Sequence, residues 1–171
     1  WSQSSPIRFV ALGDLGTHGI DKSSVLAQLK ETHFDLALIT GDVGNPHGRR
    51  DDFESSVFAA YESLMASAPF FPASGNHDYD SDDAVAFRQV FALPENSGGG
   101  DGLERWYSFN WGPLHVAVLD SQKAGAAQAA WLDADLASTG RPWKVVVQHF
   151  PTFSSGKQGA DRAVRAYFLP L

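Results

Sequence analysis

The chain has 171 residues, which suits one domain, and its 43% hydrophobic and 19% charged residues are typical of a globular protein rather than a disordered one. Thirteen Lys and Arg against 20 Asp and Glu give a formal charge of −7, which excludes a general attraction to nucleic acid or to an anionic membrane surface. The absence of cysteine excludes disulfides, zinc fingers and thiol nucleophiles. If this acidic protein handles phosphates, it therefore needs a local positive feature such as a metal ion.

Strands and helices are expected to alternate in the first half of the chain. Short apolar runs that stop at glycine indicate buried strands, whereas apolar residues spaced three or four apart indicate helices. The expected strands cover residues 7–12, 35–40 and 69–74. The expected helices cover residues 25–30, 52–67 and 81–92, the last with Ser81 as its N-cap.

The pattern changes after residues 96–102, which carry four glycines and are expected to form a loop. Strands at 106–111 and 114–120 flank Gly112-Pro113, and this arrangement predicts a hairpin. A helix at 128–138, a buried strand at 143–148 and a short helix at 161–168 are expected to follow. We therefore expect a single α/β unit without an internal repeat or a linker between domains.

Possible metal ligands stand at the ends of four expected strands. Asp14, Asp42 and Asn76 each follow a glycine that ends a strand, and His149 follows a strand directly. Because the carboxyl ends of parallel strands meet at one edge of a sheet, these four side chains are expected to converge. Carboxylate, carboxamide and imidazole groups suit Mn, Fe, Zn or Mg. One Gly-Asp pair is usually only a turn, but four such strand ends in order predict a metal site.

The remaining histidines carry weaker signals. His18 and His47 lie in loops beyond Asp14 and Asp42, near the expected crevice. His18 is a candidate for touching substrate or for replacing a ligand of the first metal. His115 lies inside an expected hairpin strand, so it is expected to be packed or paired across strands rather than catalytic.

Four sequence segments occur in the order used by one enzyme family. They are Gly-Asp-x-Gly at residues 13–16, Gly-Asp at 41–42, Gly-Asn-His-Asp at 75–78 and Val-x-x-His at 146–149. With them, the chain resembles the calcineurin-like metallophosphoesterase family, specifically its purple-acid-phosphatase-like branch. The resemblance runs over residues 7–171, after a polar tail at 1–6. It implies an α/β fold with four layers, αββα, around two mixed sheets.

The resemblance also implies two metal ions, of Fe, Mn or Zn, at a dinuclear site. Asp14 would bind the first ion, Asp42 would bridge both ions, and Asn76 and His149 would bind the second. A metal-bound hydroxide would then attack the phosphorus of a phosphate ester. The implied activity is that of an acid-phosphatase-like phosphomonoesterase, with phosphodiester hydrolysis as a close variant.

Two further roles follow from the Gly-Asn-His-Asp motif of that family. His77 would contact the phosphate and protonate the leaving group, and Asp78 would orient the imidazole of His77. The substrate would be a phosphorylated small molecule or another phosphoester. The resemblance also favours a secreted or periplasmic location, and no apolar run reaches the ~20 residues of a membrane span.

The sequence departs from the family pattern at three places. Asn45 stands where the branch has tyrosine, which weakens a preference for iron(III). Gln158 replaces a histidine found in similar chains, although the neighbouring Lys157 offers a positive charge for substrate. Gly-His-x-His, which would give one ligand to each metal, does not occur. We therefore expect a domain that lacks the last strands of the fold.

The sequence also leaves one alternative function open and disfavours two others. The missing Gly-His-x-His motif favours an alternative in which the chain is a catalytically incomplete domain of the same fold that binds phosphate or a partner. The presence of the other four motifs opposes that alternative. A P-loop nucleotide-binding protein and a serine hydrolase are disfavoured, since neither Gly-x-x-x-x-Gly-Lys-Ser/Thr nor Gly-x-Ser-x-Gly occurs.

Overall fold

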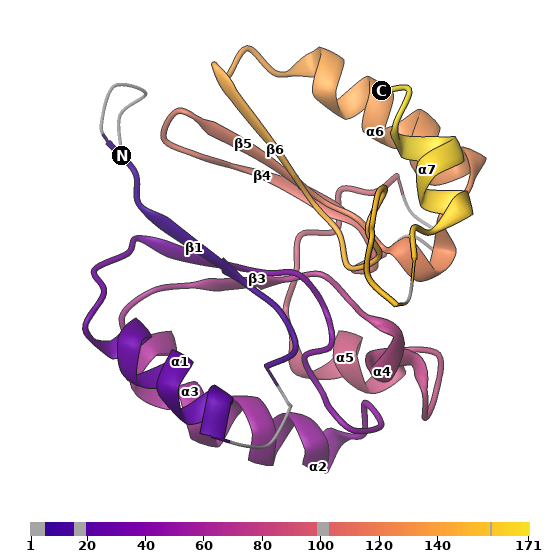
Figure 1. The fold of residues 1–171 in the computed structure, drawn as a ribbon. Helices are drawn as coiled ribbons and strands as arrows, with labels where there is room; N and C mark the ends of the chain where they lie inside the picture. The colour runs from indigo at the N-terminus through magenta and orange to yellow at the C-terminus, as the bar shows by residue number, and fades with distance from the viewer. Residues whose placement is uncertain (1–5, 16–19, 99–102, 158) are drawn as a thin grey trace.

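Two three-stranded sheets face each other between two layers of helices (Figure 1). The computed structural model describes residues 6–15, 20–98, 103–157 and 159–171, and for residues 20–22 the backbone alone. The first sheet has the order β1-β2-β3, with strands Phe9–Leu12, Leu36–Ile39 and Phe70–Pro72. The second has the order β4-β5-β6, with strands Tyr107–Trp111, Leu114–Val118 and Trp143–Val147.

The described pairing is parallel throughout the first sheet and mixed in the second. Leu36 on β2 lies opposite Phe9 on β1, and Ala37 lies opposite Phe70 on β3. In the second sheet β4 and β5 form the expected antiparallel hairpin, and β6 joins β5 in parallel. The α/β fold with four layers is thus confirmed, while the mixed pairing expected of both sheets is found in the second only.

Helices cover the outer face of each sheet (Figure 1). Beside the first sheet lie α1 (Ile20–Lys30), α2 (Arg50–Phe53), the π-helical segment Glu54–Phe58 and α3 (Ala59–Met65). Near its far end lie α4 (Asn76–Tyr79) and α5 (Val85–Val90). The second sheet is covered by α6 (Ala126–Ser138) and α7 (Arg162–Phe168), and a 3-10 turn spans Ser121–Lys123. No helix in these described stretches is long and apolar enough to cross a membrane.

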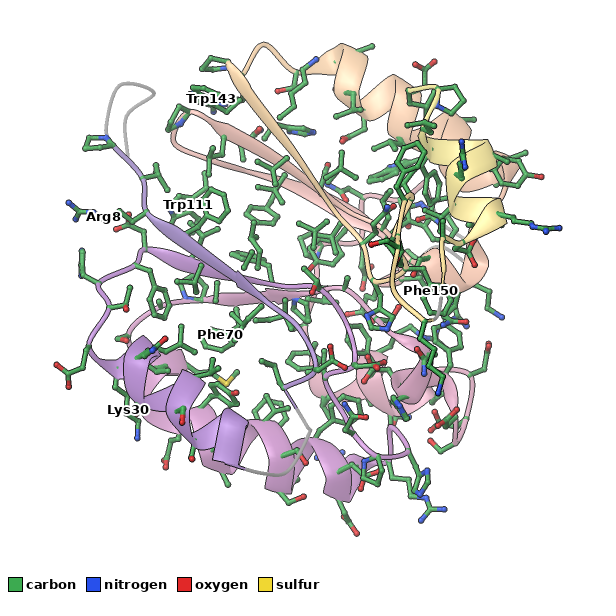
Figure 2. All side chains as sticks on the ribbon, in the orientation of Figure 1. Arg8, Lys30, Phe70, Trp111, Trp143 and Phe150 are labelled. Carbon is green, nitrogen blue, oxygen red and sulfur yellow. The ribbon has the colours of Figure 1, made fainter. Side chains whose placement is uncertain are left out.

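The main core lies between the two sheets, and side chains fill the space between the ribbons (Figure 2). Phe71 on β3 stacks on Phe109 on β4, with ring centroids 3.8 Å apart. The Tyr107 hydroxyl donates to the Pro72 carbonyl oxygen at 3.0 Å, so a polar bond also joins the sheets. A smaller apolar cluster, which includes Leu119 and Leu132, packs the second sheet against α6 and α7. Burial on both faces explains why β2 reads as an unbroken apolar run.

One expected helix begins later than its sequence predicts. Ser81 is not its N-cap, because its hydroxyl donates to the Gly48 carbonyl oxygen instead. Asp83 and Ala84 take left-handed backbone angles, with φ of 56° and 58°, and α5 therefore starts at Val85. The Asp82 carboxylate accepts the Val85 N–H at 3.0 Å, so the acidic residue caps this first turn.

Candidate metal centre

The ends of the strands meet around one pocket, as the sequence predicts. A cavity of about 720 Å³ is lined by Asp14, Asp42, Asn76, His77 and His149 from these strand ends. Its other wall comes from the segment after β6, including Phe150, Lys157 and Asp161. Phe150, which lines this pocket, lies just beyond the end of β6 in Figure 2, whereas Trp143 marks the opposite end of the strand.

Asp42 is buried at the centre of the pocket and stands in a left-handed conformation. Its φ is 53°, that of Gly41 before it is 100°, and the Asp42 side chain is 5% exposed. Asp14 repeats this conformation with a φ of 55°, and its N–H donates to the Gly41 carbonyl oxygen at 3.0 Å. Such angles are unfavourable for residues with a Cβ, and they cluster at functional sites. The turns thus hold both carboxylates at the sheet edge.

The imidazole of His149 presents one nitrogen to the pocket. Its Nδ1 lies 2.8 Å from the Thr40 carbonyl oxygen, which acts only as an acceptor, so the Nδ1 atom carries the proton. The Nε2 lone pair then faces Asn76 Oδ1 at 3.2 Å and Asp42 Oδ1 at 3.5 Å. An unprotonated nitrogen with two oxygen acceptors within 3.5 Å of it favours a cation among these atoms. A histidine held by a carbonyl through its other nitrogen is the usual arrangement of a metal ligand.

The donors around this point come from Asp42, Asn76 and His149, with Asp14 as a further carboxylate of the same pocket. In the part of the chain that the structure describes, no group of three or more His, Cys, Asp or Glu is close enough to hold an ion. The carboxamide of Asn76 provides the third donor beside Asp42 and His149. These three are the ligands expected for the second metal, whereas Asp14 lines the same pocket as the further ligand expected for the first.

His77 lies next to these donors with its ring half-exposed. Its Nδ1 donates to the Pro46 carbonyl oxygen at 2.7 Å and lies 3.3 Å from Asp80 Oδ2. Its Nε2 lies 3.9 Å from Asp42 Oδ2. Partial burial lowers the pKa of His77, but the Pro46 bond and the charges of Asp42 and Asp80 outweigh burial and raise it. A raised pKa keeps more of the imidazole protonated, which suits a proton donor.

Asp78 has a different role from the one predicted. Its fully buried carboxylate accepts the N–H groups of Val43 at 3.1 Å, Gly44 at 2.6 Å and Gly75 at 2.8 Å. Burial raises the pKa of Asp78 to about 6, against the lowering effect of these bonds. Pro46 and Asp80, rather than Asp78, hold the ring of His77. Asp78 therefore fixes α4 to the loop after β2.

This structural role predicts a loss of stability. Asp78→Asn replaces an acceptor oxygen with an amide donor facing backbone N–H groups, so we expect the free energy of unfolding to fall by about 2 kcal/mol. Urea unfolding monitored by circular dichroism measures this free energy. Asp80→Asn is the control, because the Asp80 side chain is 48% exposed and its change is expected to leave stability unaltered. Equal stability of both variants would contradict the anchoring role.

The other candidate residues have separate outcomes. Lys157 lines the pocket with an exposed side chain, as expected for a group that meets substrate. His18 lies outside the described residues. His115 is buried and bonded to Asn110 across the hairpin at 2.9 Å and to Asp135 at 2.7 Å, which confirms its packing role. Sequence reasoning missed Thr40 and Pro46, whose backbone carbonyls leave no signal in residue type.

Comparisons with known proteins agree with this fold. Residues 7–170 match the family described as calcineurin-like phosphoesterase. Purple acid phosphatase 21 of Arabidopsis thaliana is 29% identical over 163 residues, which cover 89% of this chain and 37% of that protein. Acid phosphatase type 7 of Danio rerio is 29% identical over 178 residues, which cover 90% of this chain and 38% of that protein. The chain thus spans less than half the length of these curated relatives.

A solved structure shares the fold. The structure titled "GAP50 the anchor in the inner membrane complex of Plasmodium" aligns with a TM-score of 0.62 and 17% identity. The alignment covers 96% of this chain and 61% of that one. At this identity the likeness concerns the fold alone.

Proposed function

The chain belongs to the calcineurin-like phosphoesterase family, and from that premise we propose that it hydrolyses phosphate esters at a metal centre held by Asp42, Asn76 and His149. The observation that carries the proposal is the approach of His149 Nε2 to oxygens of both Asn76 and Asp42, with the His149 tautomer fixed by Thr40. Asp14 and Asp42 would hold a second ion, which would complete the dinuclear site of a purple-acid-phosphatase-like enzyme. Fe, Mn and Zn all suit these ligands.

The chain's own residues then have distinct tasks in phosphomonoester hydrolysis. Bound ions supply positive charge to the phosphate and activate water for attack on phosphorus. His77, half-exposed beside Asp42, contacts the phosphate and donates a proton to the leaving alkoxide. Lys157 attracts the phosphate from the opposite wall of the pocket. The apolar side chains of Phe150, Pro151 and Ala160 on that wall meet the organic part of the substrate.

Metal content and turnover of the 171-residue chain together test this proposal. Elemental mass spectrometry of protein purified without chelator is expected to give close to two metals per chain. Hydrolysis of p-nitrophenyl phosphate is expected to exceed that of bis-p-nitrophenyl phosphate, and a chelator is expected to remove it. Turnover that persists unchanged after complete metal removal would overturn the proposal.

The second candidate is a catalytically incomplete domain that binds phosphate or a partner. It is favoured because the described stretches hold no group of three or more His, Cys, Asp or Glu that could bind an ion. Less than one metal per chain with no turnover, but saturable binding of inorganic phosphate, would support this candidate. Close to two metals with turnover would exclude it.

The proton-donor role of His77 predicts a dependence on the leaving group. His77→Ala is expected to slow hydrolysis of an alkyl phosphate by about 100-fold. The rate of p-nitrophenyl phosphate hydrolysis is expected to fall much less, because its leaving group needs no proton. Steady-state kcat for the two substrates measures the difference. His33→Ala removes an exposed histidine outside the pocket and serves as control. Equal losses for both substrates would contradict the role.

A further inference from the structure

A polar cluster joins Tyr79 of α4 to Arg105 and Asp120. Tyr79, the last residue of α4, donates its hydroxyl proton to Asp120 Oδ2. Arg105, whose side chain is 8% exposed, donates from Nη1 to the same hydroxyl. Burial raises the pKa of Tyr79, so its hydroxyl keeps the proton that it donates. The three groups form a chain of hydrogen bonds from guanidinium to hydroxyl to carboxylate.

The ring of Tyr79 also lies close to two cations. The Arg105 guanidinium carbon and the Lys123 Nζ lie 5.5 and 5.4 Å from the ring centroid. Both cations bind the carboxylate of Asp83, Arg105 at 2.7 Å and Lys123 at 2.8 Å. Cations placed over an aromatic face are attracted to it. The cluster therefore fixes both the ring and the hydroxyl of Tyr79.

Asp120 is rigidly placed in the second sheet layer, just beyond β5. Its side chain is fully buried, and its Oδ1 accepts the Gln122 N–H at 3.0 Å. The Gln128 side chain, on α6, bonds the backbone N–H of Asp120 at 2.9 Å and its carbonyl oxygen at 3.0 Å. Any residue bonded to this carboxylate is therefore fixed relative to the second sheet.

The helix α4 has only four residues, so its position depends on its contacts with the rest of the fold. Asp78 holds it to the loop after β2, and Tyr79 holds it to Asp120. Asn76 and His77, on the same helix, line the pocket. We propose that Tyr79 and Asp120 form a positioning pair that sets where α4 holds Asn76 and His77. This inference rests on the proposed function only where it is tested by metal binding.

Removal of one hydroxyl tests the pair. Tyr79→Phe keeps the ring near Arg105 and Lys123 but removes the bond to Asp120. The matched control is Tyr107→Phe, which also removes a buried tyrosine bond between the sheet layers but does not touch α4. Asp120→Asn perturbs the same bond from the other side, so one badly folded variant does not leave the question open.

Two measurements separate positioning from general stability. In metal-free protein labelled with ¹⁵N-histidine, Tyr79→Phe is expected to shift the ring signals of His77 while those of His115 stay in place. In a Zn²⁺ titration, the dissociation constant of Tyr79→Phe for Zn²⁺ is expected to be about tenfold higher than that of the wild type. Mutating residues that hold the metal ligands typically weakens metal binding by 10–100-fold, so this is the lower end of that range. Tyr107→Phe is expected to lower the melting temperature without either change.

The outcomes distinguish this inference from the proposed function. Identical His77 signals and Zn²⁺ affinity in Tyr79→Phe and Tyr107→Phe would overturn the positioning role. If the wild-type chain neither binds metal nor hydrolyses phosphate esters, the proposed function fails, and the His77 signals still decide the role of Tyr79. A His77 shift shared by Tyr79→Phe and Asp120→Asn supports the pair.

Discussion

Asp42→Asn is expected to reduce both metal binding and phosphoester hydrolysis by more than about 100-fold, because loss of a ligand exceeds the 10–100-fold effect of losing an outer partner. The carboxylate is buried, and its Oδ1 is 3.5 Å from His149 Nε2. Asparagine keeps the size of the side chain. It also keeps an oxygen that can accept the backbone N–H of His77, as Asp42 Oδ1 does at 2.9 Å. The fold is therefore expected to survive while the negative charge is lost.

The measurement is a Zn²⁺ titration beside steady-state hydrolysis of p-nitrophenyl phosphate. Asp133→Asn makes the same chemical change at an exposed position of α6, outside the pocket, and is expected to behave as wild type. Circular dichroism and the melting temperature check that the fold is kept. Unchanged turnover in Asp42→Asn would contradict the assignment of the pocket as a metal centre.

The strand ends of the fold could be predicted because their signals are local. A short apolar run followed by glycine and a polar residue describes the end of a buried strand without reference to the rest of the chain. The rule that parallel strands share one edge then brings Asp42, Asn76 and His149 together. The structure places them around one pocket, as predicted.

The features that were missed depend on contacts between distant segments. Asp78 is next to His77 in sequence, and the family resemblance implied that it orients the imidazole. Two of the three backbone N–H groups that its carboxylate accepts, those of Val43 and Gly44, lie some 35 positions away, which residue types do not reveal. The late start of α5 has the same origin, since Asp83 binds Arg105 and Lys123 from the second half of the chain.

The sequence pattern also did not reveal how closely the backbone at Gly41 and Gly75 approaches neighbouring side chains, although both glycines were recognised as strand ends. A Cβ on Gly75 would overlap both the backbone nitrogen and the Oδ1 of Asp42. A Cβ on Gly41 would lie 2.6 Å from the imidazole of His149, at a φ of 100° that already disfavours other residues. The glycines therefore do more than end strands, because they let the backbone of one strand end touch the ligand of another.

Gly75→Ala is consequently expected to displace Asp42, to lower the free energy of unfolding by about 3 kcal/mol or more, and to abolish metal binding. The overlap involves backbone and a buried carboxylate rather than the end of a flexible side chain, so a small adjustment cannot relieve it. Gly140→Ala is the matched control, because a Cβ there meets nothing within 4 Å. Urea unfolding and a Zn²⁺ titration compare the two variants. Wild-type metal affinity in Gly75→Ala would show that Asp42 and Gly75 are not in contact in solution, and the packing that defines this centre would then be wrong.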